Sequence, residues 1–248
     1  MKLYKKNKNG KLILINVPDY YTNISISSVY NNTSSVINKG SIDFSSLNSY
    51  FSVPASSDWA VGAGDFTIEW FQYQTSAAVG RFPRVFSVKE HPSTSVGVSI
   101  ESGTFYLWLG ANGIGYIGAS LTNYLNRWVH FAICRNGTTL NLYKDGISIS
   151  TSTNSTAANN STDPLIIGDD VVNEALSRFP GLITNFRFIK GTSVYSGNFS
   201  ISTSPLTAIS NTKLLLLADT SQGVSVDSST LQKTVTCLNP SWNSSSPF

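Results

Sequence analysis

Few residues of this chain have the types and spacing that acid–base chemistry requires. Hydrolysis of a glycosidic bond needs two carboxyl groups about 5 to 9 Å apart, and on one strand that means same-face spacing such as Glu-x-Asp. In Asp65–Tyr73, the same-face neighbours of Glu69 are Thr67 and Phe71 rather than a second acid. The dipeptide Glu90-His91 lies in a stretch typical of exposed loops, where such a pair is usually inert. We therefore expect that the chain is not an enzyme, and we predict no catalytic residue.

Metal and redox chemistry lack the required residues as well. The chain has two histidines, which are far apart, so a histidine-based zinc site is not expected. His130 lies inside an apolar stretch and is interpreted as a packed or hydrogen-bonded histidine. Cys134 and Cys237 are too far apart to form a CxxC motif. They form either two free thiols or one disulfide that closes a long loop.

One aromatic segment has the composition of a sugar site. Such a site needs aromatic faces for stacking and a few fixed polar groups. Trp108 and Tyr116 flank a glycine-rich turn that contains Asn112, and these three residues are the predicted carbohydrate-binding site. Tyr106 and Trp108 alternate with apolar residues, so the two rings lie either outside the core or within it.

Composition indicates a folded domain with little net charge. The chain has 248 residues, enough for one large domain or two small ones. Aromatic residues make up 12% of it, which a disordered chain would lack. Without the five lysines among the first 11 residues, the formal charge of +3 becomes −2, so we do not expect nucleic-acid binding. No apolar run approaches the ~18 residues of a membrane span, so no membrane insertion is expected.

Alternation of apolar and polar residues predicts strands almost everywhere. In Asp65–Tyr73, the residues Phe66, Ile68 and Trp70 share one face. The dipeptide Asp145-Gly146 is a strong hairpin signal. The other expected strands are Lys11–Val17, Arg84–Val88, Ser95–Glu101, Thr104–Leu109, Arg127–Cys134, Leu140–Lys144, Leu165–Ile167, Leu182–Ile189 and Leu214–Leu217. Because no long amphipathic helix pattern is present, we predict an all-β fold, an antiparallel two-sheet β-sandwich.

Short motifs follow one another in a specific order. The opening and middle motifs are Ser41–Phe44, Ser49–Pro54, Gly64–Trp70, Arg127–Ala132 and Leu140–Gly146. The closing motifs are Gly181–Phe188, Lys190–Thr192, Pro205–Thr207 and Thr212–Leu217. Together they resemble laminin-G-like domains of the concanavalin A-like lectin/glucanase superfamily, in the variety common in phage, large DNA virus and bacterial surface proteins. The resemblance implies a concanavalin A-like jelly roll with Trp70, Trp128, Phe186 and Phe188 between its sheets.

The resemblance also divides the chain into three parts. Residues 1–35 are expected to form an N-terminal basic segment with one strand, 36–219 the laminin-G-like β-sandwich, and 220–248 a C-terminal tail that packs on the sandwich or extends from it. Within the sandwich, residues 150–163 have too few apolar side chains for a core and are predicted to form a surface loop.

The superfamily includes lectins, glycosidases, adhesion modules and structural spacers, so the resemblance alone does not select one function. We expect first a non-catalytic module of a virion structural or attachment protein, located on a virion or an extracellular surface. The alternative is a secreted or cell-surface carbohydrate-binding module, and a glycoside hydrolase is the third reading. The expected partners are structural proteins or surface glycans, with assembly into an oligomer or a virion.

The resemblance also implies calcium, which relatives often bind at the sandwich rim through carboxylate and backbone oxygens. Asp169 and Asp170 are the one adjacent acidic pair of the chain, and they follow a predicted strand. They are the predicted metal ligands. The alternative interpretation is a pair of solvated aspartates in a turn.

Overall fold

The computed structural model describes residues 3–6, 12–15, 40–79, 81–88, 95–110, 118–158, 162–170, 174–218 and 226–248. The chain divides into two compact units, Met1–Val36 and Ile37–Phe248. The first unit contains an antiparallel hairpin of β1 (Leu3–Lys6) and β2 (Leu12–Ile15). Within the described ranges, no helix is long and apolar enough to span a bilayer.

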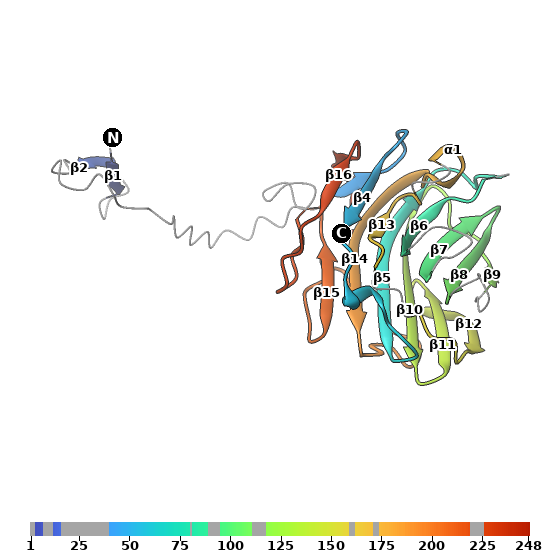
Figure 1. Cartoon of the computed structure of the whole chain (residues 1–248). Helices are drawn as coiled ribbons and strands as arrows, with labels where there is room; N and C mark the ends of the chain where they lie inside the picture. The colour runs from blue at the N-terminus through green and yellow to red at the C-terminus, as the bar shows by residue number, and fades with distance from the viewer. Residues whose placement is uncertain are drawn as a thin grey trace. The chain divides into compact units, whose positions relative to one another are not determined.

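The second unit is a sandwich of two antiparallel sheets (Figure 1). The first, here called the β5 sheet, has the strand order β12 (Ile147–Thr153), β11 (Thr139–Lys144), β10 (Trp128–Asn136), β5 (Phe66–Gln74), β14 (Gly181–Lys190), β3 (Ser41–Asp43) and β17 (Ser241–Asn243), with β15 (Thr212–Leu216) beside β14. The second, the β7 sheet, has the order β16 (Thr236–Leu238), β4 (Tyr50–Val53), β13 (Leu165–Ile167), β6 (Arg84–Val88), β7 (Val96–Glu101), β8 (Thr104–Leu109) and β9 (Gly118–Ser120). The predicted all-β sandwich is confirmed.

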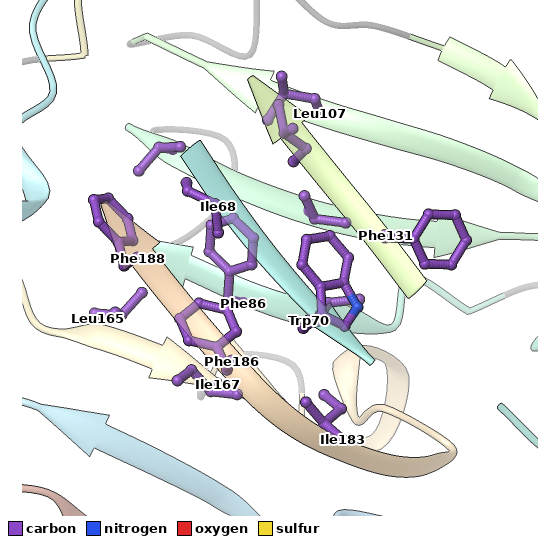
Figure 2. Packing of buried hydrophobic residues seen from close by; sticks show 14 of the residues in the cluster. Ile68, Trp70, Phe86, Leu107, Phe131, Leu165, Ile167, Ile183, Phe186 and Phe188 are labelled. Atoms are coloured by element: carbon purple, nitrogen blue, oxygen red, sulfur yellow. The ribbon is translucent and has the colours of Figure 1, made fainter. Parts of the chain in front are cut away.

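Aromatic rings fill the space between the two sheets (Figure 2). Trp70 of β5 contacts Phe86 and Phe105 from the β7 sheet and Phe131 from its own sheet, with ring centroids 5.8 to 6.2 Å apart. Phe186 and Phe188 are also buried, as expected. The expectation for Trp128 was wrong, because it has the outward parity of β10 and its indole donates to the hydroxyl of Ser245.

The predicted hairpin turn is confirmed at Asp145 and Gly146, which join β11 to β12 with φ angles of 50° and 77°. Positive φ at both positions is the signature of a type I′ turn. The loop predicted for residues 150–163 begins too early, since β12 continues to Thr153 as an exposed edge strand. Its last residues, Thr151–Thr153, are polar and largely exposed, so they carry no apolar pattern that would identify a strand.

The C-terminal segment belongs to the sandwich unit. β16 pairs with β4 at one edge of the β7 sheet, and β17 pairs with β3 at one edge of the β5 sheet. Cys237 lies on β16 and Cys134 on β10, and both thiols are free.

The outer faces of the two sheets differ. On the β5 sheet, Tyr195 and Phe199 from the segment after β14 pack on Tyr143 and Cys134. The segment thus covers part of this outer face. The outer face of the β7 sheet carries the half-buried rings of Tyr106 and Trp108 instead. The outer face of the β7 sheet therefore presents aromatic rings that an external ligand could reach.

Candidate functional site

A pocket of about 200 Å³ opens on the outer side of β6, β7 and β8. It is lined by Phe82, Arg84, Glu101, Trp108, Asp170, Leu176 and Ser177. Phe82 and Leu176 are 49% and 40% exposed and form an apolar rim, joined by a hydrogen bond from the Phe82 amide to the Leu176 carbonyl. The pocket thus combines an apolar rim, one aromatic wall and a charged floor.

Trp108 forms the aromatic wall because of the alternation along β8. Leu107 and Leu109 point into the core, so Trp108 points outward. It lies opposite Gly97 of β7, which has no side chain to displace the indole. The indole N–H donates to Ser99 Oγ at 3.1 Å, and the Ser99 hydroxyl donates to Glu101 Oε1 at 2.6 Å. These bonds fix the orientation of the ring.

Arg84 forms the floor and is almost fully buried. Its Nε lies 3.5 Å from Asp170 Oδ2, its Nη1 lies 3.9 Å from Glu101 Oε1, and its Cζ lies 5.5 Å from the Trp108 ring centroid. Burial lowers the pKa of Arg84, and the two carboxylates oppose that shift. Nε and Nη1 make no hydrogen bond with the part of the chain that the structure describes. The guanidinium is therefore held mainly by the charge of the two carboxylates, and it lines the pocket.

The loop after β13 carries Asp170 to this floor. The carboxylate of Asp169 accepts hydrogen bonds from the Asp170 amide at 2.7 Å and from the Ser177 hydroxyl. The Phe179 amide donates to the carbonyl of Gly168 and closes the loop. Asp169 is fully buried and organises the loop, while Asp170 faces the arginine.

The structure brings together two of the five predicted site residues, Trp108 and Asp170, in one pocket. Asn112 and Tyr116 lie outside the described residues. Sequence reasoning missed Arg84 and Glu101. The available signal was that Arg84 begins one mostly apolar strand and Glu101 ends the next. The register that brings these two side chains together is not visible in a sequence.

Asp169 and Asp170 fit a calcium site poorly. Calcium takes about six to eight oxygen ligands, but Asp169 is occupied by its own loop and Asp170 faces a guanidinium. Among the described residues, no three His, Cys, Asp or Glu side chains are grouped as metal ligands. The interpretation as solvated aspartates was wrong, since both are buried. The calcium site stays a prediction.

A second polar cluster lies on the covered face of the β5 sheet. Glu69 is fully buried, and its two oxygens accept bonds from Arg187 Nε at 2.9 Å and from Tyr195 Oη at 2.9 Å, while His130 Nε2 lies at 3.2 Å. Burial raises the pKa of Glu69, but the His130 hydrogen bond and the Arg187 charge outweigh burial and leave the pKa lowered. Burial and the neighbouring Glu69 raise the pKa of Tyr195. The cluster joins three strands to the covering segment and holds a packed histidine, as expected for His130.

A wider hollow of about 630 Å³ lies along residues 226–235. Its buried carboxylate, Asp227, accepts bonds from the amides of Leu215, Ser229 and Lys233. This carboxylate is committed to its own loop, so the hollow offers less ligand chemistry than the Arg84 pocket.

Solved structures share the fold at low sequence identity. One of them is a Bacteroides ovatus protein that is provisionally named a carbohydrate-binding protein. It aligns with a TM-score of 0.60 at 14% identity, over 83% of this chain and 60% of that one. Domains LG4-5 of the mouse laminin alpha1 chain give 0.48 at 18% identity, over 67% of this chain and 45% of that one. This chain spans less than two thirds of either protein. No curated protein matches its sequence.

The family is established by the sequence itself. The profile of the concanavalin A-like lectin/glucanases superfamily matches residues 44–193, which is more than half of the chain. The matched span contains every described residue that lines the Arg84 pocket. On this match and on its two-sheet fold, the chain belongs to the concanavalin A-like lectin/glucanase superfamily, as its laminin-G-like motifs indicated.

Proposed function

We propose that the chain is a non-catalytic carbohydrate-binding module and that the Arg84 pocket is its binding site. The observation that carries the proposal is the pocket itself, with one aromatic wall and a buried charged floor on the β7 sheet. Sugar sites combine an apolar surface for the C–H faces with a few fixed polar groups for the hydroxyls. The provisional carbohydrate-binding assignment of the Bacteroides ovatus protein, which shares the fold, is in line with this function.

The charged groups of the chain support binding rather than hydrolysis. A glycosidase needs two carboxyl groups on either side of the scissile bond, one acting as acid and one as base or nucleophile. Glu69 is fully buried and bonded to Arg187 and Tyr195. Glu101 and Asp170 both face the same guanidinium, which makes them partners of a charge network. We therefore propose that the pocket binds without cleaving.

The test of this function is a glycan array probed with the full chain, once with calcium and once with a chelator. We expect binding in both conditions. Binding that disappears with the chelator would instead support the predicted metal ligands Asp169 and Asp170. Silence in both conditions would contradict the proposed function and favour a scaffold that recognises other proteins.

The site is tested by Trp108→Ala. Removing the aromatic wall should cost about 2 kcal/mol of binding free energy, roughly thirtyfold in Kd. Because the ring lies outside the core, the free energy of unfolding should fall by only about 1 kcal/mol. Trp242→Ala is the matched control, since Trp242 is 39% exposed on β17 and does not line the pocket. A Trp108→Ala variant that unfolds would assign the ring to the fold instead.

We also propose that the module works at a surface, as a virion structural or attachment component, with its N-terminal unit as a docking segment. The support is the division of the chain, in which residues 1–36 form their own unit with the β1–β2 hairpin and carry five lysines. Removal of residues 1–11 should abolish incorporation into the assembly and leave thermal unfolding of the sandwich unchanged. Normal incorporation of the truncated chain would contradict this role.

A further inference from the structure

We infer that the Arg84 pocket accepts a single uncharged sugar ring at the end of a glycan and rejects rings that carry a carboxylate or a sulfate. The inference rests on the proposed function and adds the class of ligand. It follows from three properties of the pocket, which are its charge, its hydrogen-bond donors and its size.

The charge of the pocket disfavours anions. Its described lining contains one cation, Arg84, and two carboxylates, Glu101 and Asp170, so these three described side chains together carry one net negative charge. Both carboxylates already lie within 4 Å of the guanidinium. An anionic ligand that reached Arg84 would meet both at close range, and like charges repel strongly where water is excluded. Arg81 and Arg178 are not among the residues that line the pocket.

The buried donors favour a ligand that offers an acceptor. The side chain of Arg84 is 4% exposed, and its Nε and Nη1 make no hydrogen bond with described residues. Buried N–H groups are nearly always paired, with protein or with ordered water, so a ligand oxygen that reaches Nε or Nη1 would complete their hydrogen bonding. A hydroxyl group accepts from a guanidinium and donates to a carboxylate at the same time. A sugar hydroxyl is therefore the neutral group that complements Arg84 together with Glu101 or Asp170.

The size of the pocket limits the ligand to one ring. The volume of about 200 Å³ is below the range of about 300 to 1,000 Å³ that is typical for drug-sized ligands. Phe82 and Leu176 stand at the rim and bound the opening. A ring that ends a chain can enter such a pocket, whereas a ring inside a chain would need a groove that is open at both ends.

The experiment compares matched glycans on the full-length chain by calorimetric titration. One oligosaccharide is used in three forms, with a neutral terminal hexose, with the same hexose sulfated, and with a terminal sialic acid. We expect the neutral form to bind about tenfold or more tightly than either anionic form. Its Kd should change little between about 0.1 and 1 M salt, since no net charge is neutralised. Equal or tighter binding of an anionic form would overturn the inference.

Glu101→Gln separates charge from shape, because the substitution preserves the size of the side chain and removes one negative charge from the lining. The preference for the neutral glycan should shrink at least threefold, while the melting temperature reports that the variant folds. Asp170→Asn gives the same readout should Glu101→Gln fail to fold. An unchanged preference in a folded variant would contradict the charge argument. Binding of the anionic forms alone would refute this inference and leave the proposed function intact, whereas absence of binding to every glycan would refute both.

Discussion

Replacing Glu69 by glutamine tests whether the cluster on the covered face of the β5 sheet holds the fold together. The substitution preserves size and removes the charge that Arg187 and His130 face. Arg187 has a side-chain exposure of 6%, so its guanidinium would remain buried without a counter-charge. Removing one partner of a buried ion pair typically costs about 3 to 5 kcal/mol. Because glutamine keeps some hydrogen bonding, we expect a loss near the lower limit, about 3 kcal/mol.

Urea unfolding followed by circular dichroism would measure this loss, and thermal unfolding would confirm it. For a domain of this size, about 3 kcal/mol corresponds to a fall of roughly 6 to 12 °C in Tm. Asp145→Asn is the matched control, since Asp145 pairs with the exposed Arg127 and asparagine keeps an oxygen that can accept from the His130 amide. Exposed ion pairs contribute about 0 to 1 kcal/mol, so this control should remain close to the unmodified chain.

The pH dependence gives an independent readout. The pKa of Glu69 is lowered from its usual 4.5. The carboxylate therefore stabilises the fold above that value, and its contribution disappears as the pH falls through the lowered pKa. The difference in unfolding free energy between the chain and Glu69→Gln should thus be largest near neutral pH and shrink in acid. A loss below about 1 kcal/mol, or a difference that does not vary with pH, would refute a stabilising role of the charge.

Three further outcomes are expected. Arg135→Ala should lower the free energy of unfolding in urea by about 3 kcal/mol, because the fully buried Arg135 donates to the carbonyls of Gly137, Asn154 and Thr156. The control Arg127→Ala removes an exposed arginine and should cost under about 1 kcal/mol, so equal losses would contradict the prediction. Gly146→Ala should destabilise the chain by about 1 to 2 kcal/mol more than Gly137→Ala. Both glycines have positive φ, but only at Gly146 would the new methyl group overlap the carbonyl oxygen of Phe199, so equal melting temperatures would show that the segment around Phe199 moves to make room. Burial raises the pKa of both cysteine thiols, and Cys134 is the more buried of the two. Alkylation of the native chain followed by mass spectrometry should therefore label Cys237 first, and earlier labelling of Cys134 would contradict its buried position.

The sequence predicted those parts of the fold that depend on local patterns. Alternation along β5 identified Phe66, Ile68 and Trp70 as the core face, and Asp145-Gly146 identified the hairpin between β11 and β12. The strands at the margins of the sheets were less visible. β16 and β17 have three residues each, and their exposed residues carry no apolar alternation. Such strands exist because an edge is available for pairing, which is a property of the whole fold.

In the candidate site, too, local patterns could be predicted from the sequence and contacts between strands could not. Trp108 was recognised because an aromatic side chain beside a glycine-rich turn has a known chemistry, and Asp170 because it belongs to an acidic pair. Arg84 and Glu101 were missed because their roles depend on register, which places Arg84 opposite Ser99, two residues before Glu101. Glu69 is the one acid within β5, but its partners come from β10, β14 and the covering segment. Contacts between distant strands cannot be read from spacing along one strand.

The alternation along β7 and β8 separates two kinds of evolutionary change. Glu101 and Trp108 point outward, whereas their neighbours Ile100 and Leu107 are buried between the sheets. On the proposed function, substitutions at outward positions change what the pocket contacts, while the side chains between the sheets are retained. A library of variants restricted to the outward positions that line the pocket would therefore cost less stability than one at the buried positions.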